Sequence, residues 1–519
     1  MKFTLPVAIC FTLNYTIGSG FLTLPWAFCE AGLVMGPVVL FILAIFAFCT
    51  SWMVLEAMAR ATAIADLQAY ADGEDVQDLS NKPLYGSLAT KDSSAGNGAS
   101  SSGNGSDRSD SKVATASKAA GNGEPWVIGK RRIEMPDLCE TFLGPMGKTL
   151  YMISLVTYAY GSMWAYSTVF ANSWAKVFPI GDYAVETSYK LYLALWALVE
   201  IPWSTMELEE QIFVQVTLTV GRIVLVIVMV STVLYCDNNS NNSFLLQKDG
   251  TMGLGAHTDA HDTVSSTTGG SFVDWDTSHL YIIMAISIYA NNLHHSVNTL
   301  VTPLEDKRQS GLLFVASFTI TTLSYIFLGV TLATYFGSYI PSSSNLTWSS
   351  YVGVDPAAFF STGQVPFYAQ VISAFVVLFP SIDVASTFPL LAVTLGNGLM
   401  TVTYPDPKDL EKARESVSTV LLYRVVAATP PIVGAFFVSN LGSVTAYTGL
   451  TGVFISLVFP AALAVFSKAK MEQMGLPSAT LWSHGLSHAI GIFVLVGGMC
   501  SAAYILSRLL IDGVPSGLE

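Results

Sequence analysis

The feature that most constrains this sequence is a series of apolar runs that recur along almost the whole chain. A run of about 20 apolar residues is long enough to cross the hydrocarbon core of a bilayer as a helix. Such a helix satisfies its own backbone hydrogen bonds, as a lipid environment requires. Only 12% of the 519 residues are charged, against roughly a quarter in soluble domains. The chain is therefore predicted to be an all-α polytopic membrane protein.

Polar or Pro/Gly-containing breaks divide the apolar sequence into eleven expected membrane spans. They cover 4–28, 33–60, 147–175, 189–206, 211–236, 279–301, 311–337, 364–396, 418–438, 441–466 and 482–509. The first run is too long for a signal peptide, and no small-residue cleavage site follows it, so we expect it to form the first membrane helix. An odd number of spans places the two termini on opposite sides of the membrane.

The expected spans and loops divide the chain into six segments. In chain order these are spans one and two (1–60), a cytosolic loop (61–146), spans three to five (147–236), an outer loop (237–278), spans six to eleven (279–509) and a short non-cytosolic tail (510–519). The cytosolic loop contains the low-complexity sequence SSAGNGASSSGNGSDRSD. Because this composition lacks apolar residues to bury, the loop is predicted to be disordered.

Basic residues predict the orientation of the chain. Most Lys and Arg residues lie in the loops that follow even-numbered spans, and the positive-inside rule then places the N-terminus in the cytosol. Glycosylation sequons at Asn238, Asn241 and Asn345 fall on the outer side, whereas a fourth at Asn104 lies in the cytosolic loop and is expected to stay unmodified. We expect a multi-pass glycoprotein of the plasma membrane or of a vacuolar or lysosomal membrane.

The net charge and the spacing of histidine residues argue against several other classes of protein. The formal net charge is −13, and no cluster of Lys and Arg forms the basic surface that nucleic acids require. Two His pairs, His257 with His261 and His484 with His488, have metal-like spacing but no convincing further ligands, so no metal site or cofactor is expected. The sequence shows none of the clustered nucleophile or metal motifs that would indicate an enzyme. The bilayer is the expected surrounding, and no obligate protein partner is inferred.

Two spans contain residues that a lipid-facing helix avoids. The first reads LNYTIGSGFLTLPWAF, with GSG at mid-depth, and the sixth reads ISIYANNLHHSVNTL, with a polar cluster inside an apolar run. Unwound backbone is tolerated in a membrane only where it lines a cavity, and broken helices in corresponding positions of two halves point to a transporter binding site. We expect the backbone of 17–20 and the break around 289–292 to face one cavity. The alternatives are close packing of helices through small residues and a hydrogen-bond network between helices.

Ionisable residues inside membrane spans are rare and usually functional. Arg222 in the fifth span and Asp383 in the eighth lie well inside. Arg222 keeps its charge, and an unpaired charge at that depth costs at least ~2.5 kcal/mol, so we expect a carboxylate partner, for which Asp383 is the best candidate. Glu56 with Arg60, and Glu200, lie near expected cytosolic ends. There we favour snorkelling side chains or a surface pair at i,i+4.

The first-span sequence NYTIGSGFLTLPWAF resembles the first-helix signature of the amino acid/auxin permease family, part of the amino acid, polyamine and organocation transporter superfamily. His294, with Glu305 and Asp306 after it, and the sequence SNLGSVTAYTGLTGVFISLVFP within 424–460 are similar to later helices of the sodium-coupled neutral amino acid branch. The resemblance implies a five-plus-five inverted-repeat fold with one extra helix, in which helices 1 and 6 are interrupted. It also implies secondary active transport of amino acids by alternating access, in symport with an ion.

The resemblance implies roles for particular residues. The candidate substrate-binding residues, at the two helix breaks, are Ile17, Gly18, Ser19, Gly20, Phe21, Tyr289, Asn291 and Asn292. The candidate ion-coupling residues are Asn14, Arg222, His294, Asp383, Ser386 and Thr387, and Ser381 in the eighth span is a further hydroxyl candidate.

The coupling ion is left open between H⁺ and Na⁺. Asn14 is similar to a residue near the ion in sodium-coupled members, whereas Arg222 is similar to a basic residue that fills this space in proton-coupled members. In the proton alternative, Asp383 or His294 titrates. A channel or receptor would favour a continuous polar stripe over interrupted helices, and a membrane-embedded enzyme would need a catalytic cluster, so both classes fit the sequence less well.

Overall fold

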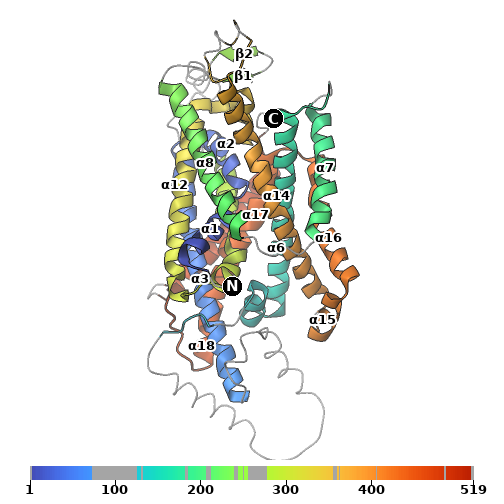
Figure 1. The fold of residues 1–519 in the computed structure, drawn as a ribbon. Coiled ribbons are helices and arrows are strands. Elements are labelled where there is room, and N and C mark those ends of the chain that lie inside the picture. Colours follow the sequence, from blue (N-terminus) through green and yellow to red (C-terminus); the bar gives the residue numbers. More distant parts are fainter. Residues whose placement is uncertain are drawn as a thin grey trace, which may run out of the picture.

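The computed structural model describes residues 3–72, 125–129, 133–181, 185–205, 212–238, 244–248, 251–254, 277–354, 359, 361, 363–404, 406–483 and 487–515. Within them, long helices run side by side along one axis and form an elongated bundle (Figure 1). Two short strands, β1 (Leu245–Lys248) and β2 (Thr251–Leu254), pair as an antiparallel hairpin at the upper end of the bundle. The expected all-α architecture therefore holds apart from this hairpin, which lies in the predicted outer loop.

The long helices follow the expected spans closely. In chain order they are α1 (Leu5–Thr16), α2 (Gly20–Ala31), α3 (Met35–Asp72), α6 (Met135–Val177), α7 (Val185–Thr205), α8 (Ile212–Asn238), α10 (Leu280–Ala290), α12 (Ser310–Phe336), α14 (Phe367–Thr403), α16 (Val417–Phe437), α17 (Leu441–Val453), α18 (Phe459–Gln473) and α19 (Ser487–Ile511). The shorter helices are η2 (His294–Ser296), α11 (Val297–Val301), η3 (Lys307–Gln309), η4 (Gly337–Tyr339), η5 (Ser344–Ser350), α15 (Pro407–Glu415) and η6 (Phe454–Val458), a π-helical turn that joins α17 to α18.

Length and composition confirm a polytopic helical membrane protein. Seven helical segments in the described part of the chain are long and apolar enough to cross a membrane, or eight when α1 and α2 count as one bent span. The segments α6, α7 and the pair α10 and α11 coincide with the other expected spans but are not among those eight. The count of eleven spans and the inverted repeat therefore stay predictions.

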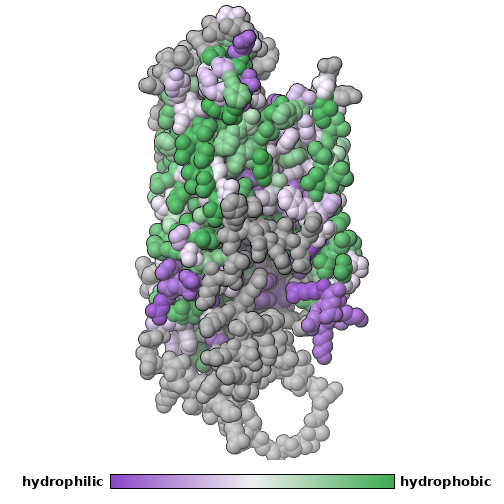
Figure 2. Space-filling model, viewed as in Figure 1, coloured by the Kyte–Doolittle hydropathy of each residue, from purple (hydrophilic) through white to green (hydrophobic). Residues whose placement is uncertain are grey.

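The outer surface of the bundle is apolar along much of its length. On the face shown in Figure 2, hydrophobic side chains cover the outer helices, and hydrophilic ones gather near the lower end, where α15 lies. Ile227 on α8 and Phe327 on α12 are each 57% exposed. Exposed apolar surface this extensive is unfavourable in water, so the helices that carry it are the ones in contact with lipid.

The two expected helix interruptions are confirmed. The axes of α1 and α2 differ in direction by 54° across residues 17–19. The sixth span divides after Ala290, where α10 ends, and helical backbone resumes at His294 in η2 and continues in α11. Both breaks lie inside the bundle, where α10 packs against α2, α3 and α17, and α6 packs against α14 and α17.

The lower end of the bundle is more ordered than the sequence predicts. The expected extent of the disordered loop, 61–146, is wrong at both ends, because α3 continues to Asp72 and α6 already begins at Met135. The alanine-rich sequence ATAIADLQAYAD favours helix, and its first residues are buried. Near the loop's other end, the Trp126 N–H donates to Ala479 O at 3.1 Å, and the Leu481 N–H donates to Trp126 O at 2.9 Å. The low-complexity core, with Asn104, lies outside the described residues.

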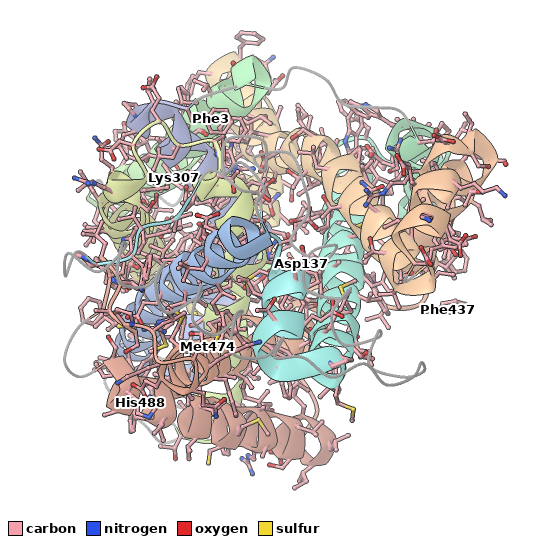
Figure 3. All side chains as sticks on the ribbon, turned by 90° about the horizontal axis from the view of Figure 1, so that it is seen from below. Phe3, Asp137, Lys307, Phe437, Met474 and His488 are labelled. Carbon is pink, nitrogen blue, oxygen red and sulfur yellow. The ribbon has the colours of Figure 1, made fainter. Side chains whose placement is uncertain are left out.

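Seen from below, the start of α6 with Asp137 lies near the middle of this end, and Phe3 and Lys307 lie to one side of it (Figure 3). The Phe3 N–H donates to Pro303 O at 2.8 Å, so the chain before α1 pairs with the chain after α11. The Lys307 ammonium donates to Gly129 O, and the Asn298 amide donates to Ile133 O at 2.6 Å. These contacts link segments that are far apart in the sequence.

The expectation that Glu56, Arg60 and Glu200 lie at the surface is wrong. The Arg60 guanidinium and the Glu56 carboxylate form an ion pair at 2.7 Å, with both side chains almost completely buried. The remaining acceptors of Arg60 are Ser467 Oγ, Ala464 O, Ser478 O and Ser483 Oγ. The chain after α18 folds back over α3 and excludes water from the pair. Glu200 is also buried, on α7, which packs against α6, α14 and α16.

Candidate functional site

The two helix breaks meet in the interior of the bundle. The hydroxyl oxygens of Ser19 and Tyr289 are 2.8 Å apart, so a hydrogen bond joins one break to the other. A Cβ atom added to Gly20 would lie 2.9 Å from Ala290 Cα, closer than real Cβ contacts. Only glycine therefore allows this approach without displacement of the backbone. The structure brings the predicted residues of 17–21 and 289–292 together.

The N-terminus of α2 is left uncapped at this junction. Ser19 occupies the N-cap position, but its side chain makes no capping hydrogen bond, because its hydroxyl contacts Tyr289 instead. The first N–H groups of a helix, here those of Gly20 and Phe21, have no acceptor within the helix, whereas the Leu22 N–H already donates to Ser19 O at 3.2 Å. Such N–H groups, at the positive end of the helix dipole, form a binding site for an anion.

Unpaired acceptors lie on the other side of the junction. The Asn291 amide nitrogen donates to Ser287 O at 2.9 Å. The amide oxygens of Asn291 and Asn292 are both buried without a hydrogen-bond partner in the described part of the chain. Most buried polar atoms are paired. These two oxygens can therefore accept from a donor that the protein itself does not supply.

Tyrosines from α6 form a wall beside the junction that sequence reasoning missed. The ring of Tyr158 lies 6.0 Å from that of Tyr289 and 5.6 Å from that of His295, between ring centroids. The Tyr166 hydroxyl would lie 3.5 Å from a Cβ added to Gly18. Tyr158 and Tyr166 are two helical turns apart and therefore share one face of α6. That spacing was the available signal in the sequence.

A third tyrosine that sequence reasoning missed connects the two helix ends. The Tyr325 hydroxyl on α12 lies 3.0 Å from Thr16 O and 3.2 Å from Ala290 O, in position to donate to either carbonyl. These are the C-terminal carbonyls of α1 and α10. Carbonyls at such half-helix ends are typical ligands of a coupling cation. In this structure a neutral hydroxyl lies between them.

Arg222 and Asp383 form the expected buried ion pair. The Arg222 guanidinium donates to both Asp383 carboxylate oxygens, from Nε at 2.8 Å and from Nη2 at 2.6 Å. Its Nη1 donates to Asn14 Oδ1 at 2.5 Å, and Thr219 Oγ1 donates to the same oxygen at 2.7 Å. Arg222 and Asp383 are both almost fully buried. The pair therefore links α1, α8 and α14, and the Asn14 amide oxygen already accepts two hydrogen bonds.

The other candidate ion-coupling residues do not join this network. The hydroxyls of Ser386 and Thr387 both donate to Asp383 O, a carbonyl of their own helix, at 2.8 and 3.1 Å. Ser381 Oγ donates to Leu378 O at 2.6 Å. Serine and threonine inside helices commonly bond to the preceding turn in this way. The Ser381 hydroxyl also accepts from the Trp174 indole N–H on α6 at 3.1 Å. None of these contacts forms a cation cage with Asn14.

His294 lies apart from the Arg222–Asp383 pair and is bonded to α3. Its Nε2 is 2.9 Å from Ala47 O, 2.9 Å from Thr50 Oγ1 and 3.1 Å from Ser51 Oγ. Because a carbonyl oxygen can only accept, the hydrogen bond to Ala47 assigns a proton to Nε2. The structure thus divides the predicted ion-coupling residues between two places.

The glycosylation prediction is wrong at one of its three sites. The Asn345 side chain is fully buried, and its amide nitrogen donates to Val377 O at 3.1 Å. A glycan is attached to that nitrogen, and this fold leaves no space for one. Asn238 is the last residue of α8, and Asn241 lies outside the described residues.

The described residues contain no group of three or more His, Cys, Asp or Glu side chains that could hold a metal ion. His257, His261 and His484 lie outside the described residues, and His488 lies in α19.

The apolar helices and the helix breaks are typical of a membrane transporter, and comparison with known proteins supports the same class. Residues 1–72, which form α1, α2 and α3, match the family model described as a transmembrane amino acid transporter protein. Together with the apolar helices, this match supports a membrane transporter rather than an enzyme.

Over most of its length the chain is similar to proteins named transmembrane protein 104. It is 23% identical over 475 residues to the homolog from Dictyostelium discoideum, covering 90% of this chain and 89% of that protein. It is 24% identical over 495 residues to the Drosophila melanogaster homolog, covering 90% and 89%. It is 22% identical over 487 residues to human transmembrane protein 104, covering 88% and 86%. These names give no substrate or ion, and they do not identify the sodium-coupled branch.

Proposed function

We propose that this protein is a secondary active transporter that moves amino acids across a membrane by alternating access. One observation carries the proposal: the uncapped start of α2 lies next to a break that holds two unpaired amide oxygens. An amino acid carries a carboxylate and an ammonium group on one carbon atom. The N–H groups of Gly20 and Phe21 suit the carboxylate, and the oxygens of Asn291 and Asn292 suit the ammonium group.

The surroundings of the junction favour amino acids with neutral side chains. Tyr158 and Tyr289 provide aromatic walls, and a Cβ on Gly452 would lie 3.3 Å from the Asn292 amide nitrogen, so α17 approaches closely here. The two buried charges nearby, Arg222 and Asp383, compensate each other. A charged substrate side chain would lose its hydration without gaining an opposite charge, which is unfavourable.

We further propose that protons, rather than sodium, drive transport. Sodium binding at Asn14 would require its amide oxygen to release the hydrogen bonds from Arg222 and Thr219. Sodium binding at the half-helix carbonyls would require displacement of the Tyr325 hydroxyl. Both places therefore already contain hydrogen-bond donors from the protein.

In this mechanism Asp383 is the residue that takes up the proton. Arg222 contacts Asn14 on α1 and Asp383 on α14, so a tilt of α1 relative to α14 pulls the guanidinium away from the carboxylate. A carboxylate that loses its buried cation is stabilised by protonation instead. The exchange of Arg222 for a proton links movement of α1 to proton uptake.

The test is uptake of radiolabelled neutral amino acids into proteoliposomes that contain the purified protein. Uptake is measured at external pH 5.5 and 7.5, with sodium or choline outside, for the wild type, Asp383→Asn and His294→Ala. We expect faster uptake at pH 5.5 in either salt, and loss of this pH dependence in Asp383→Asn. Strong sodium dependence with a flat pH profile would eliminate proton coupling. Absence of uptake for every amino acid, from a folded protein, would contradict amino acid transport itself.

A further inference from the structure

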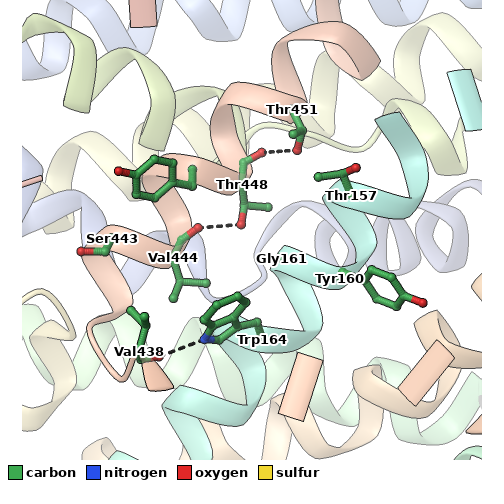
Figure 4. Close-up of a pocket in the computed structure, with 10 residues that line it drawn as sticks. Thr157, Tyr160, Gly161, Trp164, Val438, Ser443, Val444, Thr448 and Thr451 are labelled. Atoms are coloured by element: carbon green, nitrogen blue, oxygen red, sulfur yellow. Dashed lines mark hydrogen bonds between the residues drawn. The ribbon is translucent and has the colours of Figure 1, made fainter. Parts of the chain in front are cut away.

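A cavity of about 430 Å³ lies between α6 and α17 (Figure 4). Thr157, Gly161 and Trp164 line it from α6. At 3.6 residues per turn, Tyr166 lies about 140–180° around α6 from these residues and Tyr158 about 60–120°, so the two tyrosines, which face the helix breaks, lie on another face of the helix. The cavity is therefore separate from the proposed amino acid site, and α6 is the wall between the two.

The walls of this cavity present carbon rather than polar atoms. The hydroxyl of Thr157 donates to Ile153 O at 2.8 Å, and that of Thr448 donates to Val444 O at 2.6 Å. The Trp164 indole N–H donates to Val438 O at 2.9 Å. Since these polar groups already bond to backbone carbonyls, methyl groups and rings face the space. Apolar cavities of this kind exclude water and bind apolar molecules.

The cavity opens toward the lipid-facing surface. Tyr447 and Val438, which line its edge, are 49% and 39% exposed. Val438 directly follows Phe436 and Phe437 at the end of α16, and both of these rings are also exposed. The opening is thus continuous with the apolar surface that contacts the membrane, and a molecule dissolved in the bilayer can enter it sideways.

We propose that this cavity binds a sterol. Its volume lies within the ~300–1,000 Å³ of small-molecule sites, and its lining combines the flat rings of Trp164 and Tyr160 with methyl groups of Thr448 and Val444. A rigid ring system loses less conformational entropy on binding to such a lining than a flexible acyl chain does. Ser443 and Tyr447 add hydroxyl-bearing side chains to the lining, which is the chemistry that pairs with the single hydroxyl of a sterol.

The site predicts that sterol binding stabilises the folded protein, independently of transport. A ligand that binds only the folded state raises its stability in proportion to the logarithm of ligand concentration. Because one wall of the cavity is α6, the same binding restrains the helix that carries Tyr158 and Tyr166.

The test is photolabelling of the full-length protein in detergent with a diazirine-bearing cholesterol analogue, followed by mapping of labelled peptides by mass spectrometry. A second arm uses a phospholipid with a diazirine in its acyl chain. Thr157→Trp fills the cavity from an exposed position of α6, and Thr451→Phe fills it from α17. Thr149→Trp is the matched control, because it makes the same substitution at an exposed position of α6 away from the cavity.

We expect sterol label within 157–164 and 438–451, competed by excess cholesterol, and at least fivefold less label in whichever filling variant elutes as a folded monodisperse protein. Label in Thr149→Trp should equal that of the wild type. Sterol label spread over the lipid-facing helices without competition would overturn the proposal. It would also be overturned if the acyl-chain probe labelled the cavity equally well, or if label persisted in a folded filling variant.

Discussion

The Arg222–Asp383 pair makes a prediction about stability that does not depend on any transport assay. Asp383→Ala removes two charge-assisted hydrogen bonds and leaves Arg222 buried with only the Asn14 contact. Two such bonds at about 1.5–3 kcal/mol each give a loss of about 3–6 kcal/mol. This agrees with the roughly 3–5 kcal/mol observed when one partner of a buried pair is removed. Asp383→Asn keeps one acceptor oxygen but not the negative charge, so its loss should be smaller than that of Asp383→Ala and still measurable.

A double-mutant cycle separates the pair from the general effect of each substitution. Arg222→Met removes the charge while it keeps most of the side-chain volume, and Asp383→Leu does the same on the other side. The double variant contains no unpaired charge and should be close to the wild type in stability, as buried ion pairs replaced by apolar residues often are. The expected coupling free energy is therefore about 3 kcal/mol or more.

The assay is reversible unfolding of the purified protein in mixed micelles, followed by tryptophan fluorescence. Single variants that are as stable as the wild type would refute the reasoning, and so would a double variant that is no more stable than the singles. The same double variant, if folded, should have lost pH-dependent uptake, because the residues proposed to exchange the proton are gone.

Four further outcomes follow from contacts described above. Gly20→Val should abolish uptake at normal expression, because its Cβ would lie 2.9 Å from Ala290 Cα. Gly497→Val, whose Cβ would have nothing within 4 Å, should transport normally. Equal uptake by both variants would contradict the close approach. Tyr325→Phe removes the hydroxyl that can donate to Thr16 O or Ala290 O. We expect a stability loss of about 1–3 kcal/mol and new sensitivity of uptake to sodium. Unchanged unfolding and unchanged uptake would contradict this role of the hydroxyl. Asn345→Gln should leave the gel mobility of protein from a eukaryotic host unchanged. A shift of the variant to lower mass would show that Asn345 carries a glycan after all. Asp137 lies before the third expected span, and burial, aided by the neighbouring Glu134 carboxylate, raises its pKa from 3.8 to about 6. The wild type should therefore lose stability as pH rises from about 4 to 6, by at most about 3 kcal/mol. Asp137→Asn should not show this loss, and parallel pH profiles of stability for the two proteins would contradict the prediction.

The parts of the site that the sequence predicted are those where a residue is unfavourable in lipid. GSG in the first span and the two asparagines in the sixth interrupt apolar runs, and both positions are helix breaks in the structure. Arg222 requires a buried carboxylate on the same grounds, and Asp383 is its partner. Membrane insertion is selective enough that such exceptions locate functional positions.

The residues that the sequence did not predict are ordinary in a membrane helix. Tyr158 and Tyr325 are amphipathic side chains. Only the spacing to Tyr166 marked the face of Tyr158, and nothing in its neighbours marked the hydroxyl of Tyr325 as one that faces a helix break. The error at Glu56 and Arg60 has a related cause, because depth in the membrane was judged from distance to the span's end. Tertiary structure covers that end, since the chain after α18 returns across α3 and encloses the pair.

The pairing of Trp126 with Ala479 and Leu481 has a practical consequence for engineering. It anchors the return of the long loop to the bundle, while α3 anchors its departure at Asp72. The distance between the two anchors is thus set by the bundle and not by the length of chain between them. Doubling a flexible loop costs only about 0.6 kcal/mol of closure entropy. A reporter domain with adjacent termini, inserted between residues 73 and 124, should therefore leave the helices assembled, and a cut at the same place should yield two fragments that stay together.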